Sequence, residues 1–245
     1  MKYTAILIVI ASLTWTSCKD DQGDVFPTTS NNADTYFPPL SGTWETTTPE
    51  SLGWDADKIK SLYDDLEQNG TRAFLVLKNG KIVLENYWGK ILLGNTDFTS
   101  TSNWYWASAG KTLPSFMVGK AEEDGYLSLS DKSSKHLGEG WTSASKEQEN
   151  KITVWHQLSM TSGLDDALQN GSSSYMMPQS QLQLPGPIIA NAPSDAYVGL
   201  GKNGQYLCIL PSQSLVIIRM GENPDAALVP LLYLDDIWKS LNEIM

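Results

Sequence analysis

Residues 104–113 read WYWASAGKTL. In this stretch, the Ser-x-x-Lys sequence of residues 108–111 lies between an aromatic cluster and an apolar run. If a helix begins near Ser108, residues three apart share a face, so the Ser108 hydroxyl and the Lys111 amine can touch. A hydroxyl becomes an effective nucleophile when a neighbouring group takes its proton, and aromatic walls that desolvate a lysine favour the neutral amine that does so. The same Ser-x-x-Lys spacing recurs at residues 143–146, in a polar stretch without an apolar face, so the spacing alone is a weak signal.

The composition restricts the classes of partner. The chain has 245 residues, a formal net charge of -11 and only two arginines, Arg72 and Arg219, which argues against binding to a nucleic-acid backbone. Its two cysteines and two histidines show no metal-ligand spacing, so we expect no metal and no cofactor.

The N-terminus has the pattern of an export signal. Lys2 precedes an apolar run over residues 5–13, which predicts a signal peptide over residues 1–17. Cys18 follows small residues, which resembles the lipobox of bacterial lipoproteins, although Trp15 stands where leucine is usual; an ordinary cleaved signal peptide is the alternative. The next residues, Lys19-Asp20-Asp21, are similar to the export signal of surface lipoproteins in the Bacteroidetes.

This resemblance implies an outer-membrane or cell-surface protein that a lipid on Cys18 anchors to the membrane. Residues 18–48 are rich in Asp, Asn, Ser, Thr and Pro, and we expect them to form a solvated tether ahead of a domain over residues 49–245.

The first half of that domain shows a helix and a hairpin. Apolar residues spaced three and four apart after Asp55 predict an amphipathic helix, and Asn79-Gly80 between two β-rich runs predicts a hairpin over residues 73–85. A helix from Ser108 should end near Asp124-Gly125 and bury four apolar residues, namely Leu113, Phe116, Met117 and Val118.

The remaining elements are a helix over residues 152–160, strands over 195–199, 205–210 and 215–219, and a long helix over 226–241. Cys208 reads as a small buried hydrophobe in the second of these strands. The order predicts an α+β fold in which both chain ends build one antiparallel sheet that helices flank.

Several stretches in this order resemble the serine β-lactamase and penicillin-binding-protein superfamily, specifically its class C-related esterases and peptidases. The residues that carry the resemblance are Ser108 to Lys111, GYLSLSD at 125–131, KNG at 202–204, which is similar to the family's Lys-Thr-Gly, and ITVWHQLSMTSGL at 152–164, the most specific stretch.

The resemblance implies a β-lactamase/transpeptidase-like fold and an acyl-enzyme mechanism on an ester, an amide or a peptide such as a cell-wall fragment. Ser108 would attack the carbonyl, and Lys111 would take or relay its proton. The backbone N–H groups of Ser108 and Gln205 would form the oxyanion hole, and Lys202 would supply positive charge to a substrate carboxylate or to the proton network. His156 is expected to be a satisfied helix residue.

The chain departs from the family in one region. It contains no Tyr-x-Asn motif, and Tyr175, which lies where that motif belongs, is followed by Met176-Met177. Most of the helical lobe is expected to be missing between about residues 165 and 190, which would expose apolar surface. Two alternatives to the hydrolase therefore stay open: a catalytically impaired or inactive relative that acts as a surface binding protein, and a fragment without an independent function.

Overall fold

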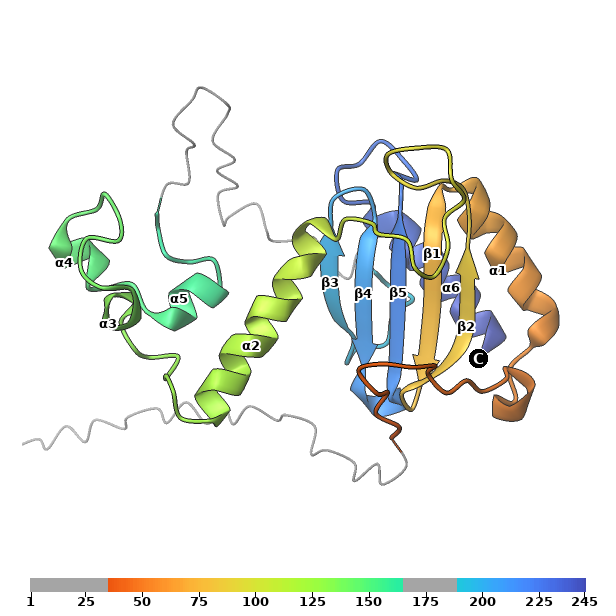
Figure 1. Cartoon of the computed structure of the whole chain (residues 1–245), viewed down its shortest axis with the longest axis horizontal. Helices are drawn as coiled ribbons and strands as arrows, with labels where there is room; N and C mark the ends of the chain where they lie inside the picture. The colour runs from red at the N-terminus through yellow and green to blue at the C-terminus, as the bar shows by residue number, and fades with distance from the viewer. Residues whose placement is uncertain (1–34, 165–188) are drawn as a thin grey trace, which may run out of the picture. The chain divides into compact units, whose positions relative to one another are not determined.

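The computed structural model describes residues 35–164 and 189–245. The predicted signal peptide, Cys18 and Tyr175 lie outside these ranges. The described residues contain a five-stranded sheet in the order β2-β1-β5-β4-β3, with every neighbouring pair antiparallel (Figure 1).

The first two strands form the predicted hairpin. β1 (Thr71–Lys78) and β2 (Lys81–Tyr87) are joined by Asn79 and Gly80, which have φ angles of 51° and 80°. Asparagine and glycine tolerate this left-handed backbone better than other residues, so they fit a two-residue turn. The hairpin prediction is confirmed.

The C-terminal half supplies the other three strands. β3 (Tyr197–Gly201), β4 (Gln205–Leu210) and β5 (Leu215–Gly221) follow one another, and β5 pairs with β1 as well as with β4. Strands from both halves of the chain therefore share one antiparallel sheet, which confirms the predicted α+β plan.

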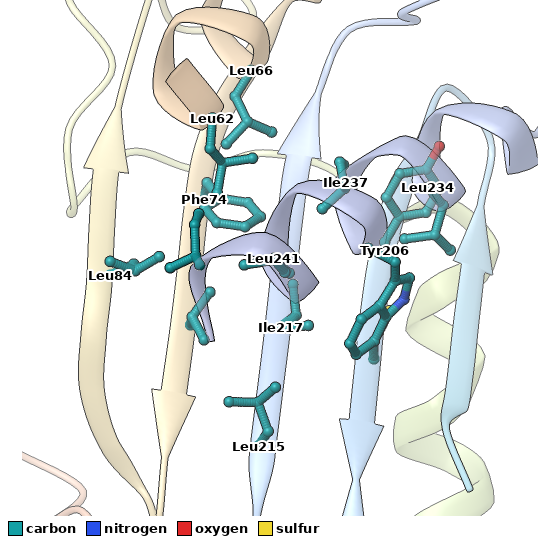
Figure 2. Close-up of a cluster of buried hydrophobic side chains, with 14 of the residues drawn as sticks. Leu62, Leu66, Phe74, Leu84, Tyr206, Leu215, Ile217, Leu234, Ile237 and Leu241 are labelled. Carbon is teal, nitrogen blue, oxygen red and sulfur yellow. The ribbon is translucent and has the colours of Figure 1, made fainter. Parts of the chain in front are cut away.

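Two helices cover one face of this sheet. α1 (Ala56–Gln68) begins after Asp55, whose side chain accepts a hydrogen bond from the Asp57 N–H, and α6 (Leu231–Ile244) lies close to the C-terminus. Their apolar residues pack with those of the strands in a single core (Figure 2), which includes Leu62, Leu66, Phe74, Ile217, Ile237 and Leu241. Cys208 belongs to this core, which confirms its prediction as a small buried hydrophobe. Burial raises the pKa of its thiol to about 12.

The last helix begins later than the sequence predicts. Helical periodicity suggested a start at residue 226, but α6 begins at Leu231, directly after Pro230. Proline in a helix interior removes a backbone hydrogen bond and clashes with the preceding turn, so it marks a start rather than a middle. The preceding segment instead meets the β3–β4 turn, where the Leu228 carbonyl accepts a hydrogen bond from the Asn203 N–H.

The predicted burial of the helix after Ser108 is wrong. A 3₁₀ turn, η2 (Ala107–Lys111), leads into α2 (Thr112–Glu123), whose end agrees with the prediction. No residue of α2 is buried, and Leu113, Phe116 and Met117 are 65%, 68% and 57% exposed.

The reason lies in the two faces of β4. Tyr206, Cys208 and Leu210 enter the core, whereas the alternating residues Leu207 and Ile209 point to the opposite face and, with residues of α2, line a groove there. α2 therefore lies at the sheet face that α1 and α6 do not bury.

The remaining helices that the structure describes are short: η1 (Glu50–Leu52), α3 (Ser133–Leu137), α4 (Lys146–Glu149), α5 (Val154–Leu158) and η4 (Pro211–Gln213). α5 is shorter than predicted and starts with a capping box in which the side chains of Thr153 and His156 each accept a backbone hydrogen bond from the other residue. His156 is thus a satisfied helix residue, as expected. Among the described helices, none has the length and apolar character needed to cross a membrane.

The hydrogen bonds of the buried Arg219 side chain are expected to stabilise the sheet. Its guanidinium is fully buried on β5 and donates to the Thr71 hydroxyl at 3.0 Å, the Gly204 carbonyl at 2.7 Å and the Asn69 carbonyl at 2.9 Å. Because Arg219→Met leaves these buried acceptors without a donor, we expect the free energy of unfolding to fall by about 1–3 kcal/mol. The midpoint of urea denaturation measures this loss.

The matched control is Lys60→Met, which removes a cation from an exposed ion pair with Asp64. That change should alter the free energy of unfolding by about 0.5 kcal/mol or less. Equal midpoint shifts in the two variants would contradict a structural role for the Arg219 hydrogen bonds.

Candidate active site

The predicted contact between Ser108 and Lys111 is present. The Lys111 ammonium nitrogen, Nζ, donates a hydrogen bond to the Ser108 Oγ over 2.8 Å. Both residues lie on η2, and a 3₁₀ helix has three residues per turn, so side chains three apart are eclipsed. The turn starts at Ala107 with a φ angle of 48°, which is a strained backbone for alanine directly before the candidate nucleophile.

The second Ser-x-x-Lys match behaves differently. Lys146 donates to Glu139 over 2.8 Å, and Ser143 is exposed in the segment before α4. At residues 143–146, the same spacing therefore pairs the lysine with a glutamate. At Ser108, the 3₁₀ turn η2 brings the serine and the lysine into contact.

The aromatic residues before Ser108 anchor the segment to the sheet. The Trp104 Nε1–H donates to the Gly221 carbonyl over 3.2 Å, and the Trp104 ring stacks on Tyr105 with 5.5 Å between ring centroids. The Arg72 guanidinium lies over the Trp104 ring, 5.8 Å from its centroid. The segment that precedes η2 is therefore held to the ends of β1 and β5.

The expected aromatic walls around the lysine are not found. Ser108 and Lys111 are both exposed, because the rings of Trp104 and Tyr105 pack against each other and against the sheet rather than over the amine. The hydrogen bond between the two side chains is confirmed, and the desolvation of Lys111 by aromatic rings is wrong.

Two glycines on β3 bring the edge of the sheet against η2 and the start of α2. A Cβ on Gly201 would lie 2.6 Å from the Trp106 carbonyl oxygen and 3.1 Å from the Ala109 nitrogen, and a Cβ on Gly199 would lie 2.6 Å from the Thr112 side chain. These positions require glycine because a side chain would push the strand away from the turn that carries Ser108. The sequence reasoning missed this role, although glycine inside a strand is the usual signal of close backbone approach.

The β3–β4 turn lies next to the same segment. Its middle residue, Asn203, has a φ angle of 63° and donates from Nδ2 to the Tyr105 hydroxyl over 2.8 Å. Lys202, the candidate source of positive charge, is exposed on this turn. The structure thus ties the turn that carries Lys202 to the segment that carries Ser108, while the charge-donating role of Lys202 stays a prediction.

Gln205 is fully buried at the start of β4, where it pairs with Gly201. Its side chain forms two hydrogen bonds with the backbone of Gly221, donating to the carbonyl over 2.8 Å and accepting from the N–H over 3.0 Å. This bidentate contact fixes the start of β4 to the end of β5. The part of the Gln205 backbone N–H in an oxyanion hole stays a prediction.

An apolar groove lies beside the pair. It has a volume of about 400 Å³, and residues of η2, α2 and β4 line it: Trp106, Ala109, Gly110, Thr112, Leu113, Phe116, Leu207 and Ile209. Because no lining residue is charged and most are apolar, the groove can accept an apolar group. In the described parts of the chain, no group of three His, Cys, Asp or Glu side chains is placed to hold a metal ion.

The comparisons agree with the resemblance found in the sequence. Residues 63–184 match the family model Beta-lactamase, about half of the 245 residues. The range includes Ser108, Lys111 and the 152–164 run, whereas Lys202 and Gln205 lie beyond it. No curated protein matches the chain. The serine–lysine pair on η2, the antiparallel sheet with its flanking helices and this match lead to one conclusion: residues 63–184 carry a domain of the Beta-lactamase family, within the serine β-lactamase and penicillin-binding-protein superfamily.

Proposed function

We propose that the protein is a serine hydrolase that forms an acyl-enzyme at Ser108. The observation that carries the proposal is the 2.8 Å hydrogen bond between Lys111 Nζ and Ser108 Oγ on an exposed turn. The Beta-lactamase family match supports serine hydrolase activity in general. Exposure of the pair agrees with a site that a substrate reaches from solvent.

The chemistry follows from the pair. After the Lys111 ammonium has released a proton to solvent, its amine accepts the Ser108 hydroxyl proton while Oγ forms a bond to the substrate carbonyl carbon. When the tetrahedral intermediate collapses, the bond to the leaving group breaks and the ammonium of Lys111 returns the proton to it. A water molecule then attacks the acyl-enzyme, the same amine takes its proton, and Ser108 regains its hydroxyl proton as the acid leaves.

The finer assignment is a class C-related enzyme for an ester, an amide or a peptide. The order of the motifs supports it, and the exposed lysine on the β3–β4 turn favours a substrate that carries a carboxylate. The exposed apolar side chains of α2 agree with the loss of a helical lobe that would cover them.

A second candidate is a catalytically impaired relative that binds its ligand without turnover. The sequence feature that favours it is the missing Tyr-x-Asn motif. A positioned general base contributes typically about 10²–10⁴-fold to a rate, so the loss of that tyrosine leaves a slower enzyme or an inactive one. The experiment on turnover below separates the two candidates.

Hydrolysis of 4-nitrophenyl acetate by the full chain tests the hydrolase. We expect turnover above the buffer rate that Ser108→Ala abolishes and that Lys111→Met lowers by about 10²–10⁴-fold, because the proton acceptor is then missing. Release of 4-nitrophenolate, measured by its absorbance, gives the rate.

The second Ser-x-x-Lys match supplies a matched pair of controls. Ser143→Ala and Lys146→Met make the same chemical changes at the same spacing, and both should retain the wild-type rate. Turnover that survives in Ser108→Ala would overturn the assignment of the nucleophile, and no turnover in the wild type would favour the binding protein.

We further propose that a lipid on Cys18 anchors the protein at the outer membrane or cell surface. The apolar run before a cysteine that follows small residues supports this, and residues 18–48, which are rich in Asp, Asn, Ser, Thr and Pro, are the proposed tether. In a Gram-negative host, we expect the wild type to incorporate labelled palmitate and to fractionate with membranes, and Cys18→Ala to do neither.

Cys208→Ala is the matched control for that experiment, because it removes the other cysteine, which is buried in the core. It should keep the label if the protein still folds. Label that persists in Cys18→Ala would contradict the lipoprotein assignment and favour an ordinary cleaved signal peptide.

A further inference from the structure

Tyr105 and Asn203 form a direct link between the nucleophile segment and the turn that carries Lys202. The Asn203 Nδ2 donates to the Tyr105 hydroxyl over 2.8 Å, across 98 residues of sequence. Tyr105 lies three residues before Ser108, and Asn203 directly follows Lys202. This hydrogen bond therefore joins the surroundings of the candidate nucleophile to those of the candidate substrate-binding lysine.

The backbone of Asn203 forms further hydrogen bonds. Its N–H donates to the Leu228 carbonyl over 2.9 Å, and its own carbonyl accepts from Gln205 Nε2 over 3.2 Å. Its left-handed backbone, with a φ angle of 63°, is one that asparagine tolerates better than most residues. The turn is thus fixed to its own hairpin and to the segment after β5, and Tyr105 adds the connection to η2.

Gly201, two residues before Asn203, brings a second contact between β3 and the turn that carries Ser108. Gly201 already lets β3 approach the Trp106 carbonyl and the Ala109 nitrogen closely, so the strand and the turn of Ser108 are in backbone contact. The Lys202 side chain itself is exposed, and its position depends on the turn that carries it.

We propose that Tyr105 and Asn203 are positioning residues, whose hydrogen bond holds Lys202 where it can bind the carboxylate of a substrate attached at Ser108. The inference rests on the proposed hydrolase function and adds to it the two residues that position Lys202. Because Tyr105 acts through Asn203 and Lys202, its removal should affect charged substrates more than neutral ones.

The test compares two esters with the same leaving group, neutral 4-nitrophenyl acetate and mono-(4-nitrophenyl) succinate, which carries a carboxylate. Tyr105→Phe removes only the hydroxyl. In this variant we expect the ratio of kcat/KM for the charged ester to that for the neutral ester to fall about fivefold, the worth of one net hydrogen bond. Tyr197→Phe, the same change on the exposed tyrosine of β3, should leave the ratio unchanged.

A double-mutant cycle with Lys202→Ala distinguishes positioning from general support of the fold. When Lys202 is absent, Tyr105→Phe should not lower the ratio further, because the group that it positions has gone. An equal loss for both esters, or a further loss of the ratio in the Lys202→Ala background, would overturn the proposal.

Failure of the hydrolase itself gives a different result. If the wild type hydrolyses neither ester, the proposed function fails, and amide hydrogen exchange then tests the link alone. Exchange of the Asn203 N–H should be faster in Tyr105→Phe than in the wild type and unchanged in Tyr197→Phe. Unchanged exchange in Tyr105→Phe would overturn the positioning role regardless of activity.

Discussion

The close approach of β3 to the turn that carries Ser108 is the constraint on which the site depends. Gly201 leaves no side chain between the strand and η2, so the backbone of the sheet edge meets the backbone of the 3₁₀ turn, and Gly199 leaves room for the Thr112 side chain at the start of α2. The turn then eclipses Ser108 and Lys111 and places their side chains in hydrogen-bond contact. A side chain at Gly201 would clash with backbone atoms, which cannot move aside as the end of a flexible side chain can.

The sheet provides a rigid support for this approach. Its core face is closed by α1 and α6. The buried Arg219 connects the start of β4 with β1 through the Gly204 carbonyl and the Thr71 hydroxyl, and the buried Gln205 connects it with the end of β5 through the Gly221 backbone. The edge strand β3 and its turn are attached to this sheet through the pairing of β3 with β4. On the other face, α2 presents apolar residues to solvent. The protein thus combines a well-packed sheet with an open site, an arrangement that gives a substrate access but excludes little water.

Local signals in the sequence predicted most of the sheet and the serine–lysine contact. Asn79-Gly80 defined the hairpin, and the Ser108 to Lys111 spacing predicted the pair, because both depend on residues that are near in sequence. The burial of α2, the start of α6 and the exposure of Lys111 were predicted wrongly. Those features depend on which sheet face receives which helix and where the aromatic rings of Trp104 and Tyr105 turn, and periodicity does not contain that information.

The most direct test of the central claim is labelling with a fluorophosphonate probe, followed by intact-protein mass spectrometry and peptide mapping of the wild type and Ser108→Ala in parallel. We expect one adduct on the wild type, located at Ser108 within the turn that precedes α2, and none on the variant. No adduct on the wild type, or the same adduct on Ser108→Ala, would contradict the claim that Lys111 activates Ser108 as a nucleophile.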